Sequence, residues 1–358
     1  MSDRLVKFFM DIVRIDSESG EEKEVIEYLQ KRFAEDLGAT CQLDGYGNLI
    51  AKVPAKNSSN EEPILLSSHA DTVKPGKGIE PVLADGMIRS AGDTILGADD
   101  KAGIAEIYEA VLTAQRHPPL EIAVTREEEI GLVGASKLDC SLLKSKKGFL
   151  FDSEHLDKIV VGGPTHVLFD VDFIGKSAHA GMEPEKGISA IQAASLAISK
   201  MKLGRLDDES TANVGIISGG SIRNGVPERC TVKAECRSLN NDHCEEIADE
   251  MEKAMEEGAA SVGATVKVNR KVAYRTHRLS EDAASVQITM KAIRDAGLEP
   301  TAHLQCGGTD ASILNERGIE TAVIGIGVHK EHTTDEEVAV ADMERAVKIL
   351  HSIFEQCA

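Results

Sequence analysis

Short apolar runs alternate with helical segments along most of this chain, and this alternation restricts its fold more than any other feature. Buried strands are predicted at residues 64–66, 120–125, 148–151 and 320–326. A helix is predicted over 102–116, between two of these runs. Strands that are separated by helices form a largely parallel sheet, whose faces the helices cover. The pattern therefore predicts an α/β domain with a central, mostly parallel sheet.

The alternation changes character after about residue 165. Apolar side chains occupy every second position over 167–173, which indicates a half-buried strand. A helix, two strands, a second helix and a last strand are then predicted, and this β-α-β-β-α-β order is that of a ferredoxin-like unit. We therefore expect a discontinuous α/β domain formed by residues 1–164 and 276–358. An α+β domain over 165–275 is inserted into it.

Composition limits the partners of the chain. It has 40 basic and 60 acidic residues, a net charge of −20, so nucleic acid and anionic membranes are not expected to bind. The first 17 residues, MSDRLVKFFMDIVRIDS, are typical of an amphipathic helix rather than of a signal peptide, and no apolar run approaches the ~18 residues that span a bilayer. Seven cysteines without a C-x-x-C pair predict free thiols and a cytoplasmic location.

Histidines and carboxylates follow the predicted strands at their carboxyl ends. Four strands run into such residues, in chain order His69 and Asp71, Glu127 to Glu129, Asp152, and the segment His329-Lys330-Glu331-His332. Asp99 and Asp100 lie in a predicted loop before the helix at 102–116. Ligands of open α/β sheets bind outside the carboxyl ends of the strands, so we expect these side chains to converge. Clustered carboxylates repel one another unless a cation lies among them. Two histidines with three carboxylates suit a pair of divalent metal ions, most often zinc.

Each of these motifs can also be explained without a metal ion. A single His-x-Asp pair such as His69 and Asp71 is a weak signal, and a run of glutamates is usually a solvated face. The Asp99–Asp100 pair could simply cap the helix that follows. Spacing alone does not choose a functional residue among the three glutamates. Only the joint occurrence of the motifs at strand ends, in one chain, favours a metal centre.

Taken together, these segments resemble the M20 family of co-catalytic zinc peptidases and deacylases, over essentially the whole chain. The matching segments are SSHADTV (67–73), ILGADDKAGIA (95–105), TREEEIGLVGA (125–135), FDSE (151–154) and GVHKEHTTDE (327–336). The inserted domain matches at GKSAHAG (175–181), at NGVP (224–227) and at Arg237, and Gly308-Thr309-Asp310 matches a loop near the family's site. Within the family, the chain is most similar to the peptidase T (tripeptide aminopeptidase) branch.

The resemblance implies a role for each matching residue of the α/β domain. Five residues would hold two divalent metal ions, most often Zn²⁺ with Co²⁺ or Mn²⁺ as alternatives: His69, Asp99, Glu129, Asp152 and His332. Asp99 would bridge both ions, and a cis peptide bond is expected between Asp99 and Asp100. Glu128 is implied as the general base that acts on a zinc-bridging water, through the Glu-Glu-x-Gly register of the family. Asp71 would support catalysis by orienting His69.

In the inserted domain, the resemblance implies residues that meet the substrate. His179 would reach the partner's site in a homodimer formed through this domain and would stabilise an oxyanion there. Asn224 and Arg237 would bind a substrate carboxylate, because a guanidinium pairs with a carboxylate in bidentate fashion.

The implied function is metal-dependent hydrolysis of peptide bonds, with release of the N-terminal residue from short peptides such as tripeptides. Asp152, rather than Glu, fits the aminopeptidase branch. Two alternatives stay open: an N-acyl-amino-acid deacylase or carboxypeptidase of the same family, and a relative that binds metal or peptide without catalysis. The sequence contains no G-x-x-x-x-G-K-[ST], G-x-G-x-x-G or G-x-S-x-G motif, so a nucleotide cofactor or a serine nucleophile is not expected.

Overall fold

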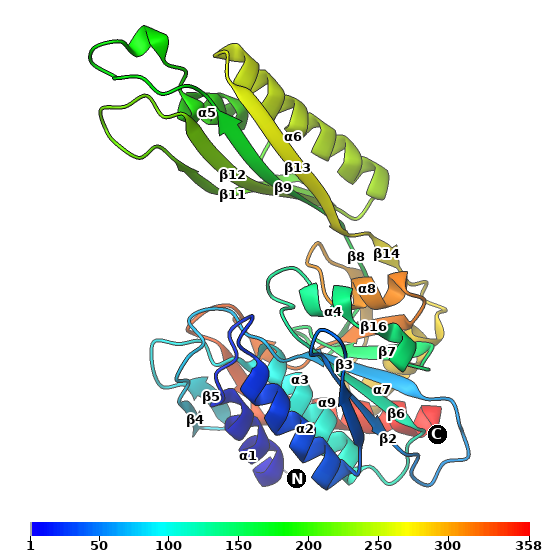
Figure 1. The fold of residues 1–358 in the computed structure, drawn as a ribbon. Coiled ribbons are helices and arrows are strands. Elements are labelled where there is room, and N and C mark those ends of the chain that lie inside the picture. Colours follow the sequence, from blue (N-terminus) through cyan, green and yellow to red (C-terminus); the bar gives the residue numbers. More distant parts are fainter. Residues whose placement is uncertain (1) are drawn as a thin grey trace. The chain divides into compact units, whose positions relative to one another are not determined.

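The computed structural model describes residues 2–358, which divide into two compact units (Figure 1). The first unit runs to Val161 and resumes over Arg278–Leu304 and Gly308–Ala358. The inserted unit consists of Gly162–His277 together with Gln305–Gly307.

Among the described residues, a nine-stranded sheet has the order β1-β2-β6-β3-β7-β16-β8-β14, and β15 also pairs with β8. The strands are β1 (Thr40–Leu43), β2 (Leu49–Val53), β3 (Ile64–His69), β6 (Leu120–Thr125), β7 (Lys147–Phe151), β8 (Lys158–Gly163), β14 (His277–Arg278), β15 (Thr301–Leu304) and β16 (Glu320–Ile324). The central strands β6, β3, β7 and β16 run parallel. Antiparallel pairs flank them, β2 with β6 and β8 with β16. The predicted α/β fold class is confirmed, with a mixed sheet that is parallel at its centre.

Both faces of this sheet are buried. Phe149 and Phe151 of β7 belong to a core shared with α1 (Ser2–Val13), α2 (Lys23–Leu37), α3 (Ala98–Thr113), α7 (Ala284–Asp295) and α9 (Val340–Cys357). Leu150, between them, packs on the other face with Ala311 of α8 (Ala311–Glu316). The short α4 (Val133–Lys137) and the 3₁₀ turn η1 (Cys140–Leu142) complete the unit's helices as described. Burial on both faces explains why these strands are continuous apolar runs.

A smaller four-stranded sheet, in the order β17-β18-β5-β4, lies in the same unit. Its strands are β4 (Pro81–Ala84), β5 (Met87–Ser90), β17 (Val328–His329) and β18 (Glu337–Ala339). Because β17 and β18 pair antiparallel, they hold the two ends of the segment that carries His332.

The inserted unit is a five-stranded sheet in the order β10-β11-β12-β9-β13, with α5 and α6 against one face (Figure 1). The elements are β9 (Thr165–Ile174), η2 (Pro184–Lys186), α5 (Ala190–Lys200), β10 (Gly204–Asp207), β11 (Ser210–Gly219), β12 (Arg229–Ser238), α6 (Asn241–Ser261) and β13 (Thr265–Tyr274). Phe169 and Phe173 of β9 share a core with Ala194 of α5 and Met251 of α6. The β-α-β-β-α-β order is the predicted one, and β10 is an added edge strand. Within residues 2–358, no helix is long and apolar enough to cross a membrane.

Candidate metal centre

Three parallel strands bring predicted site residues to one edge of the large sheet. His69 is the last residue of β3, Glu128 and Glu129 lie in the turn after β6, and Asp152 directly follows β7. Parallel neighbours end at the same edge, so their terminal side chains meet there.

Asp99 reaches the same place from the first turn of α3. This helix begins at Ala98, not at residue 102 as the sequence predicted. The turn is distorted, with φ −79° and ψ 106° at Asp99, and the expected cis peptide bond between Asp99 and Asp100 is present. Close packing accompanies this arrangement, because a Cβ at Gly103 would lie 2.6 Å from the carbonyl oxygen of Phe151. The predicted loop is therefore the irregular start of the helix.

The Asp99 carboxylate lies between two imidazoles. Its Oδ1 is 3.4 Å from His69 Nε2, and its Oδ2 is 3.1 Å from His332 Nε2. His332 Nε2 also lies 3.0 Å from Glu129 Oε2, and His69 Nε2 lies 3.8 Å from Asp152 Oδ1. Two atoms that each lie ~2.1 Å from one tetrahedral zinc ion are about 3.4 Å apart. The residues therefore fit two adjacent divalent ions that share Asp99.

Asp100 adds a carboxylate to which sequence reasoning gave no ligand role. A carboxylate oxygen of Asp100 lies within 4.8 Å of ligand atoms of His69 and Asp152. Its Oδ2 accepts hydrogen bonds from the Ser68 hydroxyl and from the His69 backbone N–H. Its Oδ1 is buried and has no hydrogen-bond partner among residues 2–358. A buried oxygen without a partner is costly, and a nearby cation would offset this cost.

Asp71 orients the site in more ways than the sequence indicated. The Nδ1 of His69 is 3.0 Å from the backbone carbonyl of Asp71, which leaves Nε2 directed at Asp99 and Asp152. The Asp71 carboxylate accepts the backbone N–H groups of Glu128 at 2.8 Å and of Glu129 at 3.2 Å. The carboxylate of Asp71 thus fixes the turn that carries both glutamates.

The three glutamates after β6 are separated by their contacts. Glu127 has a positive φ of 52°, and its carboxylate accepts a hydrogen bond of 2.7 Å from the Tyr46 hydroxyl. Glu128 is 9% exposed, and the charges of His69, Asp310 and Glu129 act on it. The turn therefore directs Glu128 and Glu129 to the centre and Glu127 to Tyr46.

The electrostatics of the centre call for added positive charge. Burial, reinforced by the neighbouring carboxylates, raises the pKa of Glu128 and of Asp152 well above the ordinary range. Burial opposes ionisation of Asp99 too, but His332 and His69 outweigh it and lower the pKa of Asp99. Asp99 and Glu129 raise the pKa of His332 to about 11. Divalent cations would stabilise all the carboxylates in their charged form.

Glu336 is a site residue that sequence reasoning missed. Its carboxylate accepts the backbone N–H groups of four consecutive residues at 2.7 to 2.9 Å: Leu96, Gly97, Ala98 and Asp99. Three of these N–H groups, those of Gly97, Ala98 and Asp99, are donors that a helix start leaves without an intrahelical partner. Gly97 gives α3 no side-chain cap, which signals that an outside acceptor is required. No local pattern could identify Glu336, because it lies 237 residues beyond Asp99.

The predicted substrate-binding residues all belong to the inserted unit, where they form two groups. His179 and Asn224 line one pocket of about 780 Å³, together with Ser218 and Gly219 of β11. The backbones around them pair, with the Ala180 N–H donating to the Asn224 carbonyl at 2.9 Å. The pocket includes Arg229, the first residue of β12, whereas Arg237 lies near the last residue of that strand. The Arg237 guanidinium is 3.0 Å from the Glu235 carboxylate. The unit itself therefore brings His179 to Asn224 but not to Arg237.

Comparison with known proteins gives consistent matches. Residues 165–262 match a family model described as a peptidase dimerisation domain. The crystal structure of aminopeptidase PepT from Bacillus cereus ATCC 10987 is 38% identical, with a TM-score of 0.86 over 100% of this chain and 99% of that one. A Staphylococcus aureus tripeptidase is 34% identical, with a TM-score of 0.91 over 100% and 98% of the two chains. The uncharacterised protein YqjE of Bacillus subtilis (strain 168) is 37% identical over 99% of this chain and 98% of its own length.

Proposed function

The chain belongs to the M20 peptidase family, in its peptidase T-like branch, and we propose that it is a metal-dependent aminopeptidase that removes the N-terminal residue from short peptides. The observation that carries this proposal is the Asp99 carboxylate, whose two oxygens face His69 and His332. One carboxylate between two histidines, with a further acid beside each, is a donor set for a pair of metal ions.

We propose Zn²⁺ for both positions. His69, Asp99 and Asp152 would hold one ion, and Asp99, Glu129 and His332 the other. Imidazole nitrogen and carboxylate oxygen suit zinc, and Co²⁺ or Mn²⁺ accept the same donors. When bound, the ions supply Lewis acidity that polarises a peptide carbonyl and makes water easier to deprotonate.

Glu128 is the proposed general base and acid. Its carboxylate takes the proton of the attacking water and then delivers that proton to the leaving amine. Burial raises the pKa of Glu128, which makes its carboxylate a stronger base toward the proton of the water. The Asp71 carboxylate positions this base through the backbone N–H of Glu128. Glu127 is not proposed for this role, because Tyr46 engages its carboxylate.

For the inserted domain, which we place at 165–275 between the two parts 1–164 and 276–358 of the catalytic domain, we propose substrate binding and dimerisation. The dimerisation-domain match supports a homodimer. His179 would stabilise the oxyanion in the partner's site, and Asn224 and Arg237 would hold a substrate carboxylate. We also propose a cytoplasmic location, since all seven cysteines are free thiols.

The test uses one tripeptide, free and N-acetylated, with enzyme that has been stripped by a chelator and then reloaded with Zn²⁺. We expect release of the N-terminal residue from the free peptide alone, and only after reloading. Cleavage of the acetylated peptide would instead indicate a deacylase or carboxypeptidase. If neither peptide is cleaved, the proposal is contradicted. The remaining alternative is then a family relative that binds metal or peptide without catalysis.

A further inference from the structure

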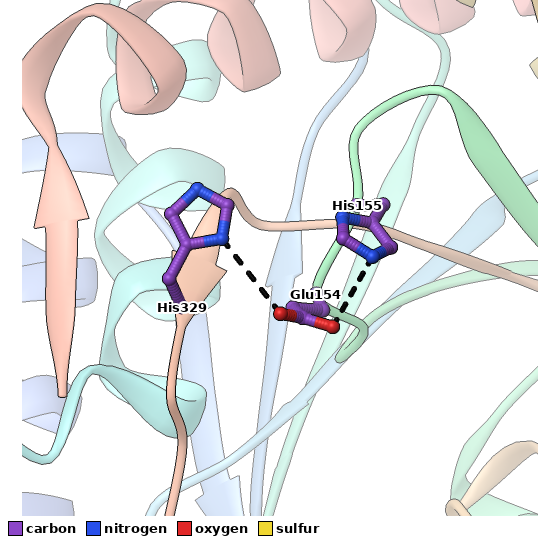
Figure 2. A group of neighbouring side chains, drawn as sticks. All are labelled: Glu154, His155 and His329. Atoms are coloured by element: carbon purple, nitrogen blue, oxygen red, sulfur yellow. Dashed lines mark ion pairs between the residues drawn. The ribbon is translucent and has the colours of Figure 1, made fainter.

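A second group of metal-binding side chains lies outside the five proposed ligands. Figure 2 shows Glu154 with its carboxylate between the imidazoles of His155 and His329. Glu154 and His155 lie in the loop after β7, and His329 is the last residue of β17. The two segments are joined by backbone hydrogen bonds, from Ile326 to Ser153 at 2.7 Å and from Gly327 to Glu154 at 3.1 Å.

The spacing of the three side chains is compatible with ligands of one metal ion. His155 Nε2 lies 3.2 Å from Glu154 Oε2, and His329 Nδ1 lies 3.7 Å from Glu154 Oε1 (Figure 2). The second separation is too long for a hydrogen bond. One ligand atom from each residue lies within 4.8 Å of the other two. Ligands of a tetrahedral ion lie about 3.4 Å apart, so small side-chain rotations would complete the site.

The surroundings favour a cation that arrives from solvent. The side chains of Glu154, His155 and His329 are 36% to 39% exposed, which leaves room for water to complete the coordination. Two imidazoles with one carboxylate are a donor set for Zn²⁺ and similar transition-metal ions.

We propose that Glu154, His155 and His329 bind a third divalent transition-metal ion, which links the loop after β7 to the segment after β16. Asp152 lies two residues before Glu154, and His332 lies three residues after His329. The third ion therefore fixes the two segments that supply one ligand to each position of the catalytic pair. Close backbone packing already holds them together, since a Cβ at Gly325 would lie 2.1 Å from the His155 carbonyl oxygen.

The test counts bound ions by equilibrium dialysis of chelator-treated full-length protein against Zn²⁺ or Co²⁺, followed by elemental analysis. We expect three ions per wild-type chain and two for the triple variant Glu154→Gln, His155→Gln, His329→Gln. The matched control is His243→Gln, because His243 also lies between two carboxylates, each 3.1 Å away, yet belongs to no three-ligand group among the described residues. This control should still bind three ions.

Two ions on the wild-type chain, or three on the triple variant, would overturn the proposal. Retention of two ions by the triple variant shows that it is folded, and the single variant His329→Gln should weaken the third ion at least about tenfold. Asp99→Asn separates this proposal from the proposed function. This variant should still bind the ion at Glu154, whereas its affinity for the two catalytic ions should fall. The ion counts therefore test the third site and the catalytic pair independently.

Discussion

The backbone N–H of Asp99 donates a hydrogen bond of 2.9 Å to the carboxylate of Glu336. The same carboxylate accepts the N–H groups of the three preceding residues, and Glu336 is only 1% exposed. The residue proposed to bridge two metal ions is thus held in place by an acid from the segment that also carries His332. Outer groups of this kind orient metal ligands and tune their affinity.

The first prediction concerns Glu336→Gln. An amide has one acceptor oxygen and directs an NH₂ group at backbone donors, so two of the four hydrogen bonds are lost. We expect metal affinity to fall about 10- to 100-fold, measured by competition with a chelator. Glu337→Gln is the control, because its partners Arg89 and Lys330 lie on the surface. Unchanged affinity in Glu336→Gln would show that Glu336 does not position Asp99.

The second prediction concerns metal removal. Without cations, the buried carboxylates at Asp99, Glu128, Glu129 and Asp152 repel one another, so chelation should lower the thermal midpoint. Restoring Zn²⁺ to 100 times its dissociation constant should return about 2.7 kcal/mol per site. Differential scanning fluorimetry with a zinc titration measures this change. In Asp99→Asn, zinc should raise the thermal midpoint by less than in the wild type. A wild-type thermal midpoint that does not change on chelation would argue against a metal centre.

The third prediction is a pH dependence that comes from His277. Both ring nitrogens of this half-buried residue are buried, and neither has a hydrogen-bond partner within the described part of the chain. Burial lowers its pKa to about 4, whereas an unfolded histidine has a pKa of about 6.5. Between these values the unfolded chain binds more protons, so His277 reduces stability as the pH falls from 6.5 to 4.

His277→Leu should therefore gain stability over the wild type as the pH is lowered. The gain should be larger at pH 5 than at pH 8 by up to about 2 kcal/mol. Urea unfolding of both proteins across this range measures it. Parallel pH curves for the two proteins would show that His277 is not buried in its neutral form.

The sequence predicted the parts of the fold that depend on long apolar runs. The strands at 64–66, 120–125 and 148–151 are buried on both faces, so their composition alone indicates a central parallel sheet. Short strands were missed: Val82 and Leu83 of β4 are each 47% exposed and give no such pattern. The edge strand β10 was missed for the same reason, with four residues that are mostly exposed.

The strand ends supplied the candidate residues and the resemblance to the family selected the proposed ligands, whereas the groups that support these ligands depend on contacts between distant segments. Spacing alone could not separate Glu127 from Glu128, and the contact with Tyr46 is what distinguishes them. Glu336 could not be paired with Asp99, because no local rule links residues 237 positions apart. His155 and His329 lie side by side only because β7 and β16 are neighbours in the sheet.

The most direct test of the proposed mechanism compares Glu128→Ala with Glu127→Ala, by measuring tripeptide turnover and bound metal on the same samples. We predict that Glu128→Ala lowers kcat by about 10²- to 10⁴-fold and keeps the metal content of the wild type. Glu127→Ala should keep most of its activity. Substantial turnover by Glu128→Ala with its metal ions bound would contradict the assignment of Glu128 as the general base.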